Sequence, residues 1–128
     1  MKAKLIYLFI WLGLILYASL TPSDKLPDFQ LFKHADKVIH WGMYFGLSFL
    51  FIPACLKEQN YKTSYLIALI FTLFIGIGME FLQPLISRGR SAEIADGIAD
   101  GIGAISGVIA YQLLIRNKKL EKIIFKIG

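Results

Sequence analysis

The sequence holds one cysteine and few charged side chains. Cys55 has no second cysteine with which to form an internal disulfide, and a single thiol also excludes a zinc site built on cysteines. Charged residues make up 18% of the 128 residues and hydrophobic residues 56%, whereas soluble domains average roughly 25% and about 45–50%. Both differences indicate a membrane protein, and the length allows at most one domain. Long disordered regions and a multi-domain soluble enzyme are therefore excluded.

Charge is almost absent from four long stretches of the chain. Each stretch approaches or exceeds the roughly 20 apolar residues that a transmembrane helix needs. Backbone groups in lipid must be satisfied internally, and the alternating segments of a β-barrel are not seen, so the stretches predict helices. We expect an all-α fold, a four-helix transmembrane bundle in which residues 1–128 form a single domain. The spans are expected at about 5–23, 38–56, 63–83 and 94–115.

The two ends of the chain have features of their own. Lys2 and Lys4 precede the first apolar stretch as in a signal peptide, but Leu20 makes the best small-x-small cleavage site poor, so we expect a retained helix. Residues 116–128 combine an apolar face with several lysines. They predict a short amphipathic tail helix on the membrane surface, with a solvated, frayed end as the alternative.

The distribution of lysine and arginine predicts the orientation. With the N-terminus inside, nine of the 14 basic residues lie on the cytoplasmic side and five on the outer side. We therefore expect a multi-pass protein of the cell membrane with both termini cytoplasmic. The net charge of +5 then reflects basic ends that face anionic lipid. Membrane lipid is the expected partner and nucleic acid is not, since no groove-binding helix or aromatic-basic platform is visible.

The acidic residues gather at the other side of the membrane. Seven of the nine carboxylates lie outside or in the outer half of a span: Asp24, Asp28, Asp36, Glu80, Glu93, Asp96 and Asp100. A charge at membrane depth costs about 2.5–3.5 kcal/mol, so such groups normally face the bundle interior and pair. Binding or chemistry is therefore expected at the outer end.

Helical spacing arranges the polar residues of three spans into stripes. The stripes are Asp36, His40 and Tyr44; Glu80 and Gln83; and Asp96, Asp100, Gly103 and Gly107. We expect them to converge into an outer polar pocket, with Arg88 and Arg90 as the nearest basic partners. Gly103 and Gly107 form a small-xxx-small pair that predicts close helix packing. Pro84 is expected to end or kink the third helix.

This polar cluster has several interpretations. In one interpretation, its charges only neutralise one another and hold the bundle together. Asp36 and His40 are candidates for a catalytic acid/base pair in which the carboxylate orients the imidazole, although no Ser or Cys nucleophile is placed beside them. The histidine and the carboxylates also suit a divalent metal, but they form no recognised metal motif. We therefore expect no metal site and no cofactor.

These residues together resemble the VanZ-like family of small bacterial membrane proteins. The resemblance rests on Ser19-Leu20-Thr21-Pro22, Asp36-Lys37, His40, Tyr44, Glu80, Gln83, Arg90, Asp96, Asp100, Gly103 and Gly107. One departure is Asp100, where the family usually has asparagine. The resemblance implies a multi-span membrane protein. The member that names the family is associated with resistance to teicoplanin, a glycopeptide that acts on the cell wall outside the membrane.

Two functions from different classes follow. The favoured one is a non-catalytic protein whose extracytoplasmic pocket binds a cell-envelope component such as a lipid-linked precursor, with a role in glycopeptide resistance. Lys37, Arg88 and Arg90 would then meet phosphate, and the carboxylates and Gln83 would meet hydroxyls. The alternative is an intramembrane acid/base or metal-dependent enzyme acting on a lipid-linked substrate, with His40 as its acid/base. A proton-coupled transporter is a weaker idea, because four short spans form a pathway only as an oligomer.

Overall fold

The computed structural model describes residues 3–20, 35–56, 60–86, 94–116 and 118–125. These ranges contain five helices and no strand: α1 (Ala3–Leu20), α2 (Ala35–Cys55), α3 (Tyr61–Ile86), α4 (Ile94–Leu114) and α5 (Lys119–Phe125). The first four are each long and apolar enough to cross a membrane. The predicted all-α bundle of four membrane helices with a short C-terminal helix is thereby confirmed.

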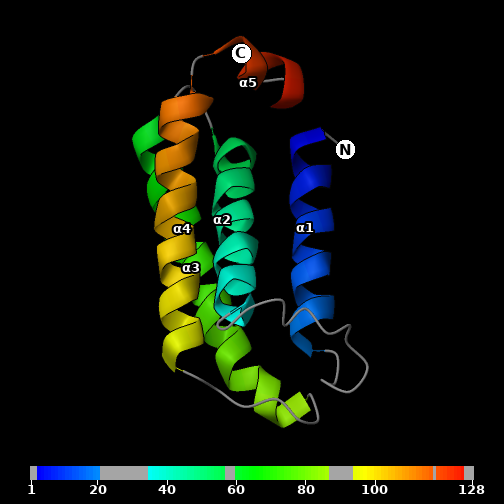
Figure 1. Cartoon of the computed structure of the whole chain (residues 1–128). Coiled ribbons are helices and arrows are strands. Elements are labelled where there is room, and N and C mark those ends of the chain that lie inside the picture. The colour runs from blue at the N-terminus through cyan, green and yellow to red at the C-terminus, as the bar shows by residue number, and fades with distance from the viewer. Residues whose placement is uncertain (1–2, 21–34, 57–59, 87–93, 117, 126–128) are drawn as a thin grey trace.

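The four long helices stand side by side and α5 lies across one end of them (Figure 1). α2 packs against α1, α3 and α4, and its most extensive packing is against α4. The N-terminus lies at the same end as α5, which we call the α5 end. The opposite end contains the end of α1, the start of α2, the end of α3 and the start of α4.

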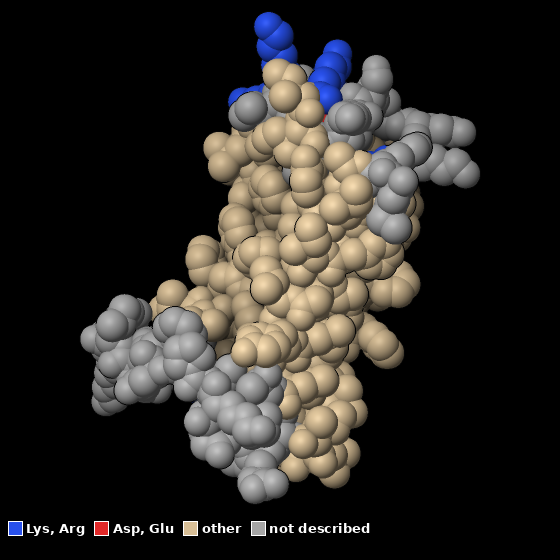
Figure 2. Space-filling model, turned by 90° about the vertical axis from the view of Figure 1, so that its right-hand side faces the viewer, with Lys and Arg blue, Asp and Glu red and all other residues tan. Residues whose placement is uncertain are grey.

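The flanks of the bundle are apolar on the outside. Large hydrophobic side chains project from every long helix, with Tyr17, Val38, Phe74 and Leu113 all more than half exposed. Figure 2 shows one such flank, with basic side chains at the α5 end. Lys118, Lys119 and Lys122 are among those exposed there. An apolar flank of this height suits a multi-pass protein surrounded by lipid.

α2 and α4 approach each other at the level of their backbones. A Cβ atom added at Gly103 would collide with the carbonyl oxygen of Trp41 and lie 3.1 Å from the amide nitrogen of Phe45. One turn further on, a Cβ at Gly107 would collide with the Phe45 carbonyl and with Oγ of Ser48. Glycine at both positions therefore permits the approach of the two helices.

α3 continues past its proline. The sequence predicts an end or a kink at Pro84, and the helix runs on to Ile86. Proline lacks the N–H that would bond the carbonyl of Glu80, but its fixed φ is compatible with helical backbone. Because Pro84 stands within the last turn, the lost bond does not prevent the final two residues from remaining helical.

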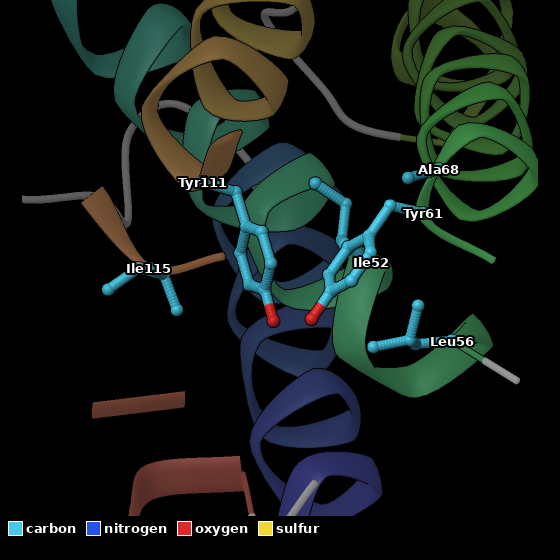
Figure 3. Close-up of a cluster of buried hydrophobic side chains, with 6 residues drawn as sticks. All are labelled: Ile52, Leu56, Tyr61, Ala68, Tyr111 and Ile115. Atoms are coloured by element: carbon cyan, nitrogen blue, oxygen red, sulfur yellow. The ribbon is translucent and has the colours of Figure 1, made fainter. Parts of the chain in front are cut away.

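α5 is fastened to the bundle by a buried carboxylate. The hydroxyls of Tyr61 and Tyr111 converge within the hydrophobic cluster that Figure 3 shows. Tyr61 donates a 2.5 Å hydrogen bond to Oε1 of Glu121, and Tyr111 donates one of the same length to Oε2. The Glu121 residue is only 2% exposed. The sequence predicts a surface helix but not this burial. α5 thus caps the bundle through a polar contact, while Ile123 and Ile124 remain exposed.

Candidate functional site

Ionisable side chains of three helices meet near the opposite end of the bundle. They are Lys37 and His40 of α2, Glu80 of α3, and Asp96 and Asp100 of α4, which we call the polar cluster. Residues three or four apart share one face of a helix, so each pair points toward the facing helix. Four of the five, all except Lys37, belong to the polar stripes that the sequence analysis expects to converge.

His40 lies between the two aspartates of α4. Its Nδ1 is 2.9 Å from Oδ1 of Asp100, and its Nε2 is 3.7 Å from Oδ2 of Asp96. Lys37 donates a 2.6 Å hydrogen bond from Nζ to Oδ1 of Asp96. The imidazole is therefore oriented mainly by Asp100, and Asp96 forms an ion pair with Lys37.

Asp100 has one carboxylate oxygen that is not satisfied. Oδ1 contacts His40, but the buried Oδ2 has no hydrogen-bond partner among the residues that the structure describes. Oδ2 lies 3.4 Å from the position that a Cβ on Gly76 would occupy, so it faces α3. Buried carboxylate oxygens are nearly always paired, and leaving one unpaired costs at least about 1–3 kcal/mol. A ligand that donates a hydrogen bond to this oxygen, or a cation that binds it, would therefore stabilise the cluster.

Glu80 brings a second carboxylate to the same place from α3. One ligand atom from each of His40, Glu80 and Asp100 lies within 4.8 Å of the other two. Three different helices supply these atoms, so their separation depends on the packing of the bundle. The arrangement suits a small cation, or a group that donates several hydrogen bonds.

A groove between α3 and α4 leads to these carboxylates. Its volume is about 460 Å³. The lining residues are Leu73, Gly76, Ile77, Glu80 and Phe81 of α3, and Ile94, Gly97, Ile98 and Asp100 of α4. Phe81 and Ile94 are 70% and 85% exposed, so the groove opens through an apolar rim. The groove therefore combines an apolar entrance with two ionisable groups.

Two other predicted site residues have different positions. Tyr44 is buried, and its ring carbon Cε1 lies 3.4 Å from the Cβ position of Gly76, next to Asp100. The amide of Gln83 instead donates a 3.1 Å hydrogen bond to the carbonyl of Ser19 and so links α3 to α1. Tyr44 thus borders the polar cluster, whereas Gln83 does not line the groove.

Three further candidates lie outside what the structure describes. Asp36 belongs to α2, but its side chain is not among the described ones, and Arg88 and Arg90 fall in the undescribed residues 87–93. Their roles stay predictions, including the catalytic pairing of Asp36 with His40. Among the described residues, the carboxylate that hydrogen-bonds the imidazole of His40 is that of Asp100.

Of the nine groove residues, sequence reasoning named only Glu80 and Asp100, and the seven that it missed include Gly76 and Gly97. A signal for these two glycines existed, because a glycine inside a membrane helix either admits a neighbouring helix or leaves space. Gly97 leaves space, since a Cβ there would meet nothing within 4 Å. Gly76 gives room to Asp100 and Tyr44.

Comparison with known proteins supports the resemblance seen in the sequence. No curated protein and no solved structure matches the chain significantly. The model of the VanZ/LLP1 family matches residues 4–115, a range that includes almost all of the four long helices and the whole polar cluster. The chain therefore belongs to the VanZ/LLP1 family.

Proposed function

We propose that this membrane protein binds a lipid-anchored component of the cell envelope in the groove between α3 and α4. The observation that carries the proposal is the composition of the groove. Its rim is apolar and exposed, with Phe81 and Ile94 at the surface, and its lining includes the carboxylates of Glu80 and Asp100. An apolar entrance and a polar interior match the two parts of an amphiphile.

The charges of the cluster favour a head group that carries hydroxyls. Carboxylates accept hydrogen bonds and repel bare phosphate, so Glu80 and Asp100 suit a sugar. Lys37 already pairs with Asp96 at 2.6 Å. Two further cations, Arg88 and Arg90, stand in the sequence that joins α3 to α4, where they would meet a phosphate between sugar and lipid. A lipid-linked sugar is therefore the proposed ligand class.

The basic residues support an outer-leaflet location for the groove. Most described cations lie at the α5 end: Lys4, Lys62, Arg116, Lys118, Lys119 and Lys122. Short basic ends normally remain cytoplasmic, which would place both termini inside and the polar cluster toward the outside. Cell-wall precursors are found on that side, and glycopeptides such as teicoplanin act there. We therefore propose a role in glycopeptide resistance as well.

The binding proposal is tested by filling the groove. Gly97→Leu puts a side chain into the groove from a position with no neighbour within 4 Å, so the variant should fold. Gly78→Leu is the matched control, because Gly78 is equally open but does not line the groove. We expect mass spectrometry of lipids co-purified from a bacterial membrane to show a lipid-linked sugar with wild type and Gly78→Leu, and its loss with Gly97→Leu.

Equal lipid profiles for the two leucine variants would contradict the proposal.

The same variants test the resistance role in cells where the wild-type chain changes survival under teicoplanin. Gly97→Leu should lose that effect while accumulating normally in the membrane, whereas Gly78→Leu should keep it. A survival effect retained by Gly97→Leu would separate resistance from the groove.

A second candidate function rests on the contact between His40 and Asp100. A carboxylate 2.9 Å from one ring nitrogen can fix the tautomer of an imidazole that acts as acid or base. Under this alternative the bound lipid-linked substrate is converted rather than only held. His40→Gln should then abolish turnover of the co-purified lipid while its binding persists. Recovery of the unchanged lipid from wild-type protein after prolonged incubation would refute the enzyme alternative.

A further inference from the structure

We propose that His40, Glu80 and Asp100 bind one divalent metal ion of the zinc class where α2, α3 and α4 meet. Each residue offers one ligand atom, and the three atoms lie within 4.8 Å of one another. Zinc lies roughly 2.0–2.2 Å from nitrogen and oxygen ligands, so two of its ligands stand about 3–3.5 Å apart. Nδ1 of His40 lies 2.9 Å from Oδ1 of Asp100, so the imidazole is already next to the carboxylate that carries the unpaired Oδ2. Small side-chain movements would therefore complete the site.

The orphaned oxygen of Asp100 is independent evidence for a ligand. Asp100 is 3% exposed, and its Oδ2 has no hydrogen-bond partner among the described residues. It faces Gly76 of α3, one helical turn before Glu80, and both residues line the groove. A cation would satisfy this oxygen without a donor from the protein.

The donor set indicates which ions fit. An imidazole favours zinc and its transition-metal neighbours over magnesium and calcium, which prefer oxygen ligands alone. Soft ions that require thiolate are excluded, because Cys55 ends α2 at the α5 end. With a neutral imidazole the three ligands carry two negative charges, which a divalent ion balances. Three protein ligands also leave a coordination position open, as in catalytic zinc sites.

Asp96 lies next to the proposed metal site but is not one of its three ligands. Its carboxylate is held by Lys37 at 2.6 Å and lies 3.7 Å from Nε2 of His40. It is therefore held mainly by Lys37, and it lies beside the imidazole without being one of the three proposed ligands. This inference goes beyond lipid binding and does not depend on it, since zinc binding by these three side chains needs no lipid.

The test measures zinc binding by the full-length chain in detergent. After removal of metal with a chelator, the protein competes for zinc with a chromogenic indicator, and bound metal is counted by mass spectrometry after dialysis. We expect one zinc per chain and at least about 10-fold weaker binding in His40→Gln, Glu80→Gln and Asp100→Asn. Glu121→Gln is the matched control, because it removes another buried carboxylate at the α5 end, and its zinc affinity should equal that of wild type. Absence of stoichiometric binding, or equal affinity in all variants, would overturn the proposal.

A second measurement needs only the wild-type chain and so remains decisive if the variants fail to fold. X-ray absorption of the zinc-loaded protein should show one imidazole, two or more oxygen ligands and no sulfur. A shell without imidazole, or one that contains sulfur, would place the ion elsewhere. Zinc should also bind more tightly than magnesium, and the reverse order would contradict the assigned donor set.

Discussion

Replacing Gly103 with alanine should destabilise the bundle by separating α2 from α4. The added methyl would collide with the carbonyl oxygen of Trp41 and lie 3.1 Å from the amide nitrogen of Phe45. Both obstacles are backbone atoms, so no side-chain rotation can relieve the contact. One of the two helices has to move, and the packing along their shared face has to change with it.

The magnitude follows from two opposing effects. Inserting a methyl into a closely packed contact typically costs about 1–3 kcal/mol, and a backbone obstacle favours the upper half of that range. Alanine in place of glycine within a helix returns about 0.5–1 kcal/mol. The net loss is therefore about 1–2 kcal/mol, which multiplies the unfolded fraction roughly 5- to 30-fold. Gly107→Ala should cost at least as much, because its methyl also displaces the Ser48 hydroxyl that bonds the Ala104 carbonyl at 2.8 Å.

The assay is reversible unfolding in mixed micelles with increasing denaturing detergent, followed by helical circular dichroism. Gly97→Ala is the control on the same helix, since its methyl would meet nothing within 4 Å and it should be neutral or slightly stabilising. We expect the free energies of unfolding to separate the Gly103 variant from this control by about 2 kcal/mol. Equal stability of the two variants would refute the close approach of α2 and α4.

Two further predictions concern the buried carboxylates. Glu121→Ala removes the acceptor for the hydroxyls of Tyr61 and Tyr111. It should therefore lower the free energy of unfolding by about 1–3 kcal/mol and expose α5 to proteolysis. An unchanged melting temperature and cleavage pattern would contradict a stabilising role of these hydrogen bonds. Lys37→Met leaves the carboxylate of Asp96 without its ion-pair partner and should cost about 1–3 kcal/mol, part of which Asp96→Asn restores in the double variant. Strictly additive losses in this double-mutant cycle would mean that the pair contributes nothing.

The four membrane helices could be predicted because their signal is local. A run of about 20 apolar residues specifies a span, and helical spacing specifies which side chains share a face. That spacing was sufficient to bring His40, Asp96 and Asp100 into one prediction, and the structure places them in contact. The costs of charge in lipid explain why those residues face the interior.

Contacts between distant segments could not be predicted in the same way. Gln83 shares a stripe with Glu80, yet its amide bonds the backbone of Ser19, because the position of α1 against α3 is not encoded in the spacing of either helix. The burial of Glu121 depends on two tyrosines that lie 60 and 10 residues away in the chain. A tail rich in lysine gives no local sign of such partners.

The contrast between the two buried carboxylates bears on whether the polar cluster is only structural. Glu121 illustrates a carboxylate that holds helices together, since a tyrosine hydroxyl bonds each of its two oxygens. Asp100 is equally buried, but one of its oxygens has no hydrogen-bond partner in the described part of the chain and faces a groove. A cluster selected for stability alone gains nothing from that oxygen, because an unpaired buried acceptor is destabilising. The cost is explained if the oxygen binds a ligand, so Asp100, rather than the more fully paired Asp96, is the residue on which a functional role of the cluster depends.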